Sequence, residues 1–558
     1  MASLSILIGS ESFRELRENG YRYVDKTSIL EEMLDPVLAK VLLITRPRRF
    51  GKTLMLTMLQ EFLDVRAKDR NLFEGLAIAE NKQICDAWMH QHPTLFLTLK
   101  GVEGRNYDFA LGQMSELLRV LCIEHGYLLE SKKVNPEDKK KLAVIKNDAG
   151  SEKDLANALN LLCRALEAHW GKPVILLIDE YDVPINYAAQ KGYYDEMISF
   201  MRNFLGSTLK TNPSLKFAVL TGCLRIAKES IFTGLNNFAC YGISDSRFAD
   251  KFGFTPQEVD ALLALAEMPG RKKDIKDWYD GYHFGREAEM YCPWDVLQYI
   301  TDLQYDPDMK PKAYWNNTSG NAIVRKLIEQ SGTETRGKIE DLIAGRAIEE
   351  RLEEDLTYDQ VYRKEGSLWS MMYLTGYLTR AAKQPDNGNT ALVIPNREVR
   401  MIFIDKVRSW FEDSLERQDL HPFVEALWKG NAETVRNTLN AILYDTISYF
   451  DNAENFYRGF LAGVLRGAGL ALKTEREGGL GRADIVIEDG RNRRAIIIEL
   501  KYAKEYADLD ARAAEGLRQI DERNYAAGLE PQIRRVLKYG IAFWKKESAV
   551  NALESERQ

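Results

Sequence analysis

The chain has 558 residues, of which 45% are hydrophobic and 28% are charged, as in ordinary soluble globular proteins. This length predicts roughly three or four domains. The formal net charge of −7 argues against a general nucleic-acid coat. It leaves a local basic groove open, because affinity depends on the phosphates that are contacted.

The cysteines and apolar segments indicate a compartment. Six cysteines without a CxxC or paired spacing predict reduced thiols in a cytoplasmic protein. The six histidines are scattered, which argues against zinc. All apolar runs are far shorter than a membrane span, and the start of the chain lacks the basic segment of a signal peptide. We therefore expect no membrane partner.

Residues 41–53 give the first functional signal. An apolar run typical of a strand leads into a short loop, and residues 54–63 follow with a helical pattern. Amide groups of a loop that opens a helix bind phosphate oxygens. Lys52 would reach the β/γ-phosphates and the Thr53 hydroxyl would hold Mg²⁺. The residues expected to bind a nucleotide are Arg46, Pro47, Arg48, Arg49, Phe50, Gly51, Lys52 and Thr53.

The loop departs from the pattern G-x-x-x-x-G-K-[ST] at its first position, where Arg46 replaces a glycine. That glycine normally lets the backbone turn sharply. Arg46, Arg48 and Arg49 would instead put three cations beside the phosphates. The alternative is a basic turn in which Gly-Lys-Thr occurs by chance, but the flanking strand and helix favour a nucleotide loop.

Residues 174–182 (VILLIDEYD) form a second signal. Five apolar residues that end in Asp179 and Glu180 are typical of a buried parallel strand, and ligands bind at the carboxyl ends of such strands. Asp179 would hold Mg²⁺ through water, and Glu180 would deprotonate the attacking water. A core strand capped by surface acids is the alternative, which the preceding nucleotide loop disfavours.

Two further strands are predicted at residues 93–101 and 215–222. The second ends at Thr221, which we expect to sense the γ-phosphate through a hydrogen bond. Arg225 follows and would supply charge in the transition state, although an ordinary surface arginine is an equal alternative.

Residues 251–430 have mainly helical patterns. Thr255 and Glu258 predict a capping box at the start of one helix. Residues 367–400 predict a helix, a strand, a turn and a second strand, an order that resembles a winged helix. Basic residues are sparse there, so we expect this region to hold a nucleotide-dependent conformation rather than to bind DNA.

Residues 481–502 predict a β-hairpin around Asp489-Gly490. Glu499 and Lys501 leave the second strand on one face, and the hairpin can bring Asp484 beside them. Two carboxylates and a lysine predict a Mg²⁺ site, where the metal acts as a Lewis acid. An exposed ion pair at a strand end is the alternative reading.

Several segments resemble the bacterial AAA-ATPase-like proteins, many of which carry a C-terminal nuclease domain of the PD-(D/E)XK superfamily. The resemblance covers nearly the whole chain and rests on residues 23–27, 46–53, 176–184 and 221–237, among others. It implies an α/β fold with a P-loop NTPase core and an extra strand between the Walker motifs, which residues 93–101 fit. An arginine at the first loop position is usual in that family.

The nuclease resemblance extends to single residues. Asp484 and Glu499 match the two acids of the motif, and Lys501 matches its lysine, whereas Ala483 replaces the proline. Further resemblance is implied for Glu454, as a metal-binding acid of the first helix, and for Gln519 and Tyr525 on a following helix. A helix-capping acid and a surface glutamine explain Glu454 and Gln519 equally well.

Three domains are predicted: an AAA-like ATPase domain (1–250), a helical lid or winged-helix-like region (251–430), and an α/β restriction-endonuclease-like domain (431–558). The first hypothesis is an enzyme that hydrolyses ATP and cuts DNA with Mg²⁺, in defence or DNA processing. The second is an ATP-switched regulatory or DNA-binding protein with a non-cleaving, nuclease-like scaffold. Both hypotheses leave open whether the protein forms a homo-oligomer.

Overall fold

The computed structural model describes residues 4–34, 39–225, 238–285, 287–315, 333–354, 356, 365–415, 419–445, 453–478 and 481–557. The chain divides into two compact units, one of residues 1–318 and 349–400 and the other of residues 319–348 and 401–558. Much of the helical middle of the sequence belongs to the first unit. The division into three domains stays a prediction.

The first unit is built on a five-stranded parallel sheet with the order β2-β3-β4-β1-β5. All four strands predicted for this region are present, and β2 lies beyond β3 at the edge. Because β4 separates β1 from β3, the ends of these three strands lie side by side. The strands are β1 (Val41–Thr45), β2 (Thr94–Thr98), β3 (Val174–Asp179), β4 (Leu215–Gly222) and β5 (Phe238–Tyr241).

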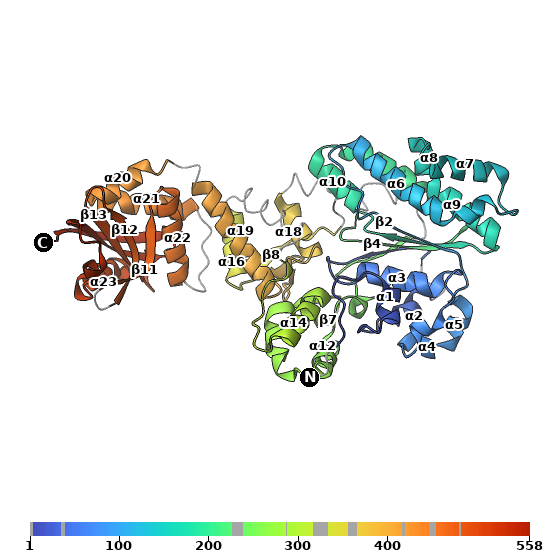
Figure 1. Ribbon diagram of the computed structural model, residues 1–558, viewed down its shortest axis with the longest axis horizontal. Helices are drawn as coiled ribbons and strands as arrows, with labels where there is room; N and C mark the ends of the chain where they lie inside the picture. The colour runs from blue at the N-terminus through green and yellow to red at the C-terminus, as the bar shows by residue number, and fades with distance from the viewer. Residues whose placement is uncertain are drawn as a thin grey trace. The chain divides into compact units, whose positions relative to one another are not determined.

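Helices cover both faces of this sheet, which confirms the expected α/β class (Figure 1). One face carries α1 (Phe13–Glu18), α2 (Ile29–Met33), α3 (Lys52–Leu63), α4 (Ala77–Glu80) and α5 (Lys82–Trp88). On the other face lie α6 (Tyr107–Glu124), α7 (Pro136–Lys146), α8 (Glu152–Ala156), α9 (Ala158–Trp170), α10 (Val183–Lys191) and α11 (Tyr194–Leu209).

The later part of the first unit contains the predicted capping box. The Thr255 side chain accepts from the amide of Glu258, whose carboxylate accepts from the Thr255 amide. The predicted helix–strand–strand order is present as α18, β9 and β10, whereas its winged-helix role stays a prediction. The elements are α12 (Pro256–Leu265), α13 (Lys272–Tyr279), β6 (Tyr282–Phe284), β7 (Glu287–Met290), α14 (Pro293–Tyr305), β8 (Ile348–Glu350), α18 (Glu365–Leu374), β9 (Thr379–Arg380) and β10 (Thr390–Val393).

The second unit holds a mixed sheet with the order β11-β12-β13-β14-β15, in which only β13 and β14 pair in parallel. The predicted hairpin is the pair β12–β13. The strands are β11 (Leu472–Gly478), β12 (Gly481–Asp489), β13 (Arg494–Tyr502), β14 (Arg535–Trp544) and β15 (Glu547–Glu556). The helices are α16 (Thr333–Ile343), α20 (His421–Lys429), α21 (Ala432–Asp445), α22 (Ala453–Gly467) and α23 (Leu509–Glu522), together with α19 (Arg397–Leu415) from Met401 onward.

An apolar core lies on each face of this mixed sheet. On one face, side chains of α20, α21 and α22 pack with Ile485, Ile498 and Tyr539. On the other face α23 approaches β14 closely, because a Cβ at Gly540 would overlap backbone atoms of Ala513 and Leu517. Because of this close contact, the residues of α23 lie near the middle of the sheet.

Within the described parts of the chain, no helix has both the length and the apolar character needed to cross a membrane. None of the six cysteines is in a disulfide bond within the described residues.

Candidate nucleotide and metal sites

The loop between β1 and α3 closes around Lys52. Gly51 precedes the helix with φ of 83°, a left-handed conformation that suits glycine. Only 4% of Lys52 is exposed, and its Nζ donates to the carbonyls of Arg46 and Pro47, both at 3.1 Å. The lysine charge and the first amides of α3 therefore lie at one place, as phosphate binding requires.

Arg46 lies elsewhere than expected. Its guanidinium is fully buried and donates to the carbonyls of Thr45, Tyr241, Gly242 and Phe248 at 2.8–3.1 Å. Burial lowers its pKa to about 10. The structure thus corrects the expectation that this side chain is a cation beside the phosphates, because its donors hold the segment after β5.

Arg49 also turns toward the later part of the unit. Its guanidinium stacks on Trp294, 4.3 Å from the ring centre, and donates to the Tyr314 carbonyl at 3.4 Å. Its φ of 69° is uncommon for a residue with a side chain. The loop conformation at Arg49 is therefore tied to α14 and the segment that follows it.

Two other loop residues, Pro47 and Phe50, are enclosed by this same region. The ring centre of Phe50 lies 5.0 Å from that of Tyr282 and 5.1 Å from that of Phe284. A Cβ at Gly376 would lie 2.9 Å from the Pro47 ring. Through these contacts and those of Arg49, the loop after β1 packs against the later part of the first unit.

Asp179 joins the ends of three strands and the start of α3. It is fully buried and accepts hydrogen bonds from Thr53 at 2.7 Å and Thr221 at 2.6 Å. Thr98 at the end of β2 adds a longer contact of 3.4 Å. Burial raises the pKa of Asp179, and the hydroxyls of Thr221 and Thr53 oppose that shift. The sequence located the strand of Thr98 but did not assign this residue.

Glu180 follows in a left-handed conformation with φ of 52°, which is the kind of local strain found at functional sites. Its carboxylate lies 3.8 Å from Lys52 Nζ. Asp182, which the sequence did not single out, accepts from the amides of Cys223 and Leu224, both at 3.0 Å. Burial and the charge of Glu180 raise the pKa of Asp182 to about 6.

The second site lies where two strands separate. Pairing between β12 and β13 ends at Ile485 and Ile498, so Asp484 and Glu499 lie just beyond the last pair. The amide of Leu500 donates to Asp484 Oδ2 at 2.8 Å. This separation opens the sheet beside both carboxylates.

The structure brings the predicted residues of this site together. Lys501 Nζ lies 3.3 Å from Glu499 Oε1 and donates to Gln519 at 2.6 Å. The Gln519 amide donates to the same Glu499 oxygen and to the Tyr525 hydroxyl at 3.0 Å. Tyr525 begins a separate 3₁₀ turn after α23, which corrects its expected place on the helix of Gln519.

Glu499 has a perturbed pKa. Only 5% of it is exposed, and burial, followed by the charge of Asp484, raises its pKa to about 7. Its Oε2 is buried and has no hydrogen-bond partner among the described residues. A hard divalent cation fits two adjacent carboxylates with one oxygen unused. Asp484 and Glu499 are the side chains that would hold it.

The sequence did not single out Arg458. Its Nη2 lies 2.9 Å from Asp484 Oδ1, so α22 supplies a cation to the site. Over the described part of the chain, no group of three or more His, Cys, Asp or Glu side chains is arranged to hold a metal. The carboxylate pair would therefore need water or backbone oxygens to complete an octahedral shell.

Known families match both regions. Residues 7–232 match the family model described as a predicted AAA-ATPase, and residues 452–552 match that of the PD-(D/E)XK nuclease superfamily. The chain thus joins a region that matches the AAA-ATPase model, called here the AAA-ATPase-like region, to one that matches the PD-(D/E)XK model, called the PD-(D/E)XK region. It is also 28% identical, over 72% of its length and 69% of the relative, to an uncharacterized protein in the vnfD 5′ region of Azotobacter chroococcum mcd 1.

These matches place the candidate residues in their expected regions. Lys52, Asp179 and Thr221 lie in the AAA-ATPase-like region, and Asp484 and Glu499 lie in the PD-(D/E)XK region. The expected family resemblance is thereby confirmed for both parts of the chain.

Two assignments fall at the limits of the described residues. Glu454 lies in α22, but its side chain is outside the described part, so its role as a metal ligand stays a prediction. Arg225 directly precedes residues 226–237, which the structure does not describe. Its role in the transition state also stays a prediction.

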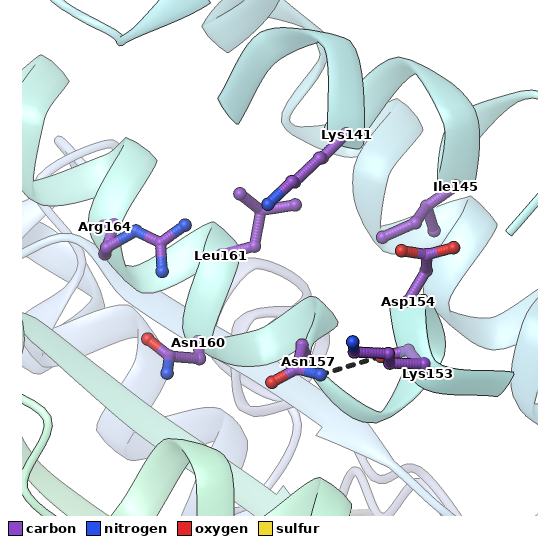
Figure 2. A pocket seen from close by; sticks show the side chains of 8 residues that line it. All are labelled: Lys141, Ile145, Lys153, Asp154, Asn157, Asn160, Leu161 and Arg164. Carbon is purple, nitrogen blue, oxygen red and sulfur yellow. Dashed lines mark hydrogen bonds between the residues drawn. The ribbon is translucent and has the colours of Figure 1, made fainter. Parts of the chain in front are cut away.

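A hollow of about 260 Å³ lies among α7, α8 and α9 of the AAA-ATPase-like region. Figure 2 shows Lys141 and Arg164 on either side of Leu161 at this hollow. Arg164 is paired with Asp138 at 2.7 Å. None of the residues assigned to ATP or metal lines the hollow, so it belongs to neither candidate site.

Proposed function

We propose that this protein binds and hydrolyses ATP in its AAA-ATPase-like region. Lys52 and the loop amides bind the phosphates, while Thr53 and Asp179 hold Mg²⁺ with the nucleotide. Glu180 orients and deprotonates the attacking water. The proposal is supported by the short contacts of Thr53 and Thr221 with one buried aspartate.

For the PD-(D/E)XK region, the proposed activity is Mg²⁺-dependent cleavage of DNA. The observation that carries it is the buried Glu499 oxygen without a partner, beside Asp484 and Lys501. A divalent cation on these carboxylates would act as a Lewis acid on the phosphodiester. Lys501, oriented by Gln519, would stabilise the attacking water or the scissile phosphate. Defence or DNA processing in the cytoplasm is the proposed setting.

One observation favours the second hypothesis of an ATP-switched, non-cleaving DNA-binding protein. Arg458 already pairs with Asp484. This ion pair neutralises the acid without a metal, which suits a site that does not cleave DNA.

A nuclease assay separates the two functions. Plasmid, linear and single-stranded DNA are incubated with the full-length protein and Mg²⁺ or Mn²⁺, with and without ATP. Asp484→Ala and Lys501→Ala are the matched variants, and ATP binding is measured on each. We expect cutting that requires metal and both residues, with ATP binding unchanged. Equal cutting by both variants would refute the assignment, and absence of cutting by a protein that binds ATP would favour the DNA-binding hypothesis.

A further inference from the structure

Asp484 and Glu499 are satisfied to different extents. Asp484 Oδ1 is paired with Arg458 at 2.9 Å, and its Oδ2 accepts from the Leu500 amide at 2.8 Å. In Glu499, both nitrogen donors meet Oε1, and Oε2 has no hydrogen-bond partner among the described residues. A cation could therefore reach Glu499 directly but would compete with existing contacts at Asp484.

Of the contacts that Asp484 makes with Arg458 and with the Leu500 amide, the one with Arg458 is the easier to break. The Leu500 amide belongs to β13, which pairs with β14 along its length, so it cannot move without the sheet. Arg458 has a long side chain, 23% of which is exposed. A guanidinium and a divalent cation on one carboxylate also repel each other.

The backbone that carries Arg458 is held in place by its neighbour. The Tyr457 hydroxyl donates to the Lys545 carbonyl at 2.7 Å, and its ring stacks on Phe543 with 4.6 Å between ring centres. Release of Arg458 from Asp484 can therefore occur by rotation of its side chain, with the backbone of α22 unchanged.

We propose that Arg458 and the divalent cation exchange at Asp484. Arg458 neutralises the acid before metal binds, and metal binding releases the guanidinium to contact a phosphate of the DNA backbone. This inference rests on the nuclease function proposed above. The chemistry suits an arginine, because its planar fork of donors binds carboxylate and phosphate with the same geometry. Arg458 thus changes partner from a carboxylate to a phosphate.

Metal affinity tests the exchange independently of cleavage. Full-length wild-type protein and Arg458→Gln are titrated with Mn²⁺ by calorimetry without nucleotide, and Asp484→Ala serves as the blank for other sites. We expect Arg458→Gln to bind Mn²⁺ about tenfold more tightly, because a charged hydrogen bond no longer competes. At saturating Mn²⁺ the same variant should cut DNA with a higher KM, because a phosphate contact is lost.

Two variants control for charge and folding. Arg466→Gln removes an exposed arginine from the same helix and should leave Mn²⁺ affinity unchanged. Arg458→Lys keeps the charge without the fork and should lie between wild type and Arg458→Gln. Unchanged or weaker Mn²⁺ binding by Arg458→Gln, with a clear loss in Asp484→Ala, would overturn the exchange alone. Identical titrations of wild type and Asp484→Ala would overturn the metal site itself.

Discussion

The Thr221 hydroxyl donates a hydrogen bond of 2.6 Å to Asp179 Oδ1, and this contact joins the carboxyl ends of β4 and β3. Thr53 donates to the other oxygen at 2.7 Å. These two hydrogen bonds hold Asp179 between β4 and α3. Since burial raises its pKa, the two hydroxyl donors favour the charged form that a metal site needs.

Replacing Thr221 by valine should impair hydrolysis more than nucleotide binding. The variant keeps the shape of the side chain and removes a hydrogen bond to a charged group, worth about 1.5 kcal/mol or more. We expect kcat for ATP to fall about tenfold and the Mg²⁺ requirement to rise. Thr221→Ser restores the donor and should behave like wild type, and a Thr221→Val enzyme with a normal Mg²⁺ requirement would show that the contact is dispensable.

Glu180→Gln should separate binding from hydrolysis. The amide keeps the size of the side chain and cannot accept a proton from water, so kcat should fall by about 10² or more while ATP remains bound. Lys52→Ala is the complementary variant and should weaken ATP binding itself. Nucleotide affinity and single-turnover hydrolysis measure the two effects, and normal hydrolysis by Glu180→Gln would remove this residue from its catalytic role.

Arg46→Lys tests the corrected role of the first loop residue. Lysine preserves the charge, but one ammonium group cannot reach the carbonyls that the guanidinium binds in separate directions. A buried carbonyl left without a donor costs about 1–3 kcal/mol. Thermal unfolding should therefore occur several degrees lower. A variant with wild-type stability and weaker ATP binding would instead indicate that Arg46 contacts the phosphates.

The sequence was sufficient to locate the strands of the first sheet but not their order. Apolar runs marked β1, β2, β3 and β4 because buried parallel strands have continuous hydrophobic sequences. The insertion of β4 between β1 and β3 depends on contacts between distant segments. For the same reason the sequence did not reveal that Thr221 donates a hydrogen bond to Asp179.

Glu499 should make the stability of the metal-free protein depend on pH. Its pKa is about 7 in the folded protein and 4.5 ordinarily. Between these values the folded state binds more protons than the unfolded state, so the free energy of unfolding falls as pH rises and levels off above 7. Relative to wild type, Glu499→Gln should gain at most about 3 kcal/mol between pH 4.5 and 8.

Urea unfolding in EDTA at several pH values measures this gain. Mn²⁺ should reverse the ranking at pH 8, because only wild type retains both carboxylates to bind it. A stability difference that does not change with pH would show that Glu499 titrates normally.

Gly540→Ala should disrupt the PD-(D/E)XK site from β14, where Gly540 pairs with Glu499. The added methyl group would overlap the backbone of α23 at Ala513 and Leu517, at a cost of about 3 kcal/mol. We expect loss of metal binding, since the displaced helix carries Gln519, and unchanged ATP binding. Gly459→Ala in α22 is the matched control, because its methyl group would meet no atom within 4 Å. Equal metal binding by both variants would contradict the close approach.

Short-range spacing explains which parts of the second site were predictable. Glu499 and Lys501 are two residues apart on one strand, and the hairpin turn brings Asp484 to them. The sequence does not indicate Arg458, because its contact with Asp484 crosses from α22 to β12 and a lone arginine in a helical pattern carries no signal. Tyr525 was misplaced because α23 ends at Glu522, three residues earlier than expected.

The separation of β12 and β13 leaves the Leu500 amide bound to a side chain, Asp484, instead of a backbone carbonyl. Its hydrogen-exchange rate therefore depends on how firmly that carboxylate is held. Neighbouring amides of β13 that pair with backbone partners should exchange independently of it. A single backbone proton thus offers a spectroscopic record of the occupancy of Asp484, readable by NMR of isotope-labelled protein without a substrate or a cleavage product.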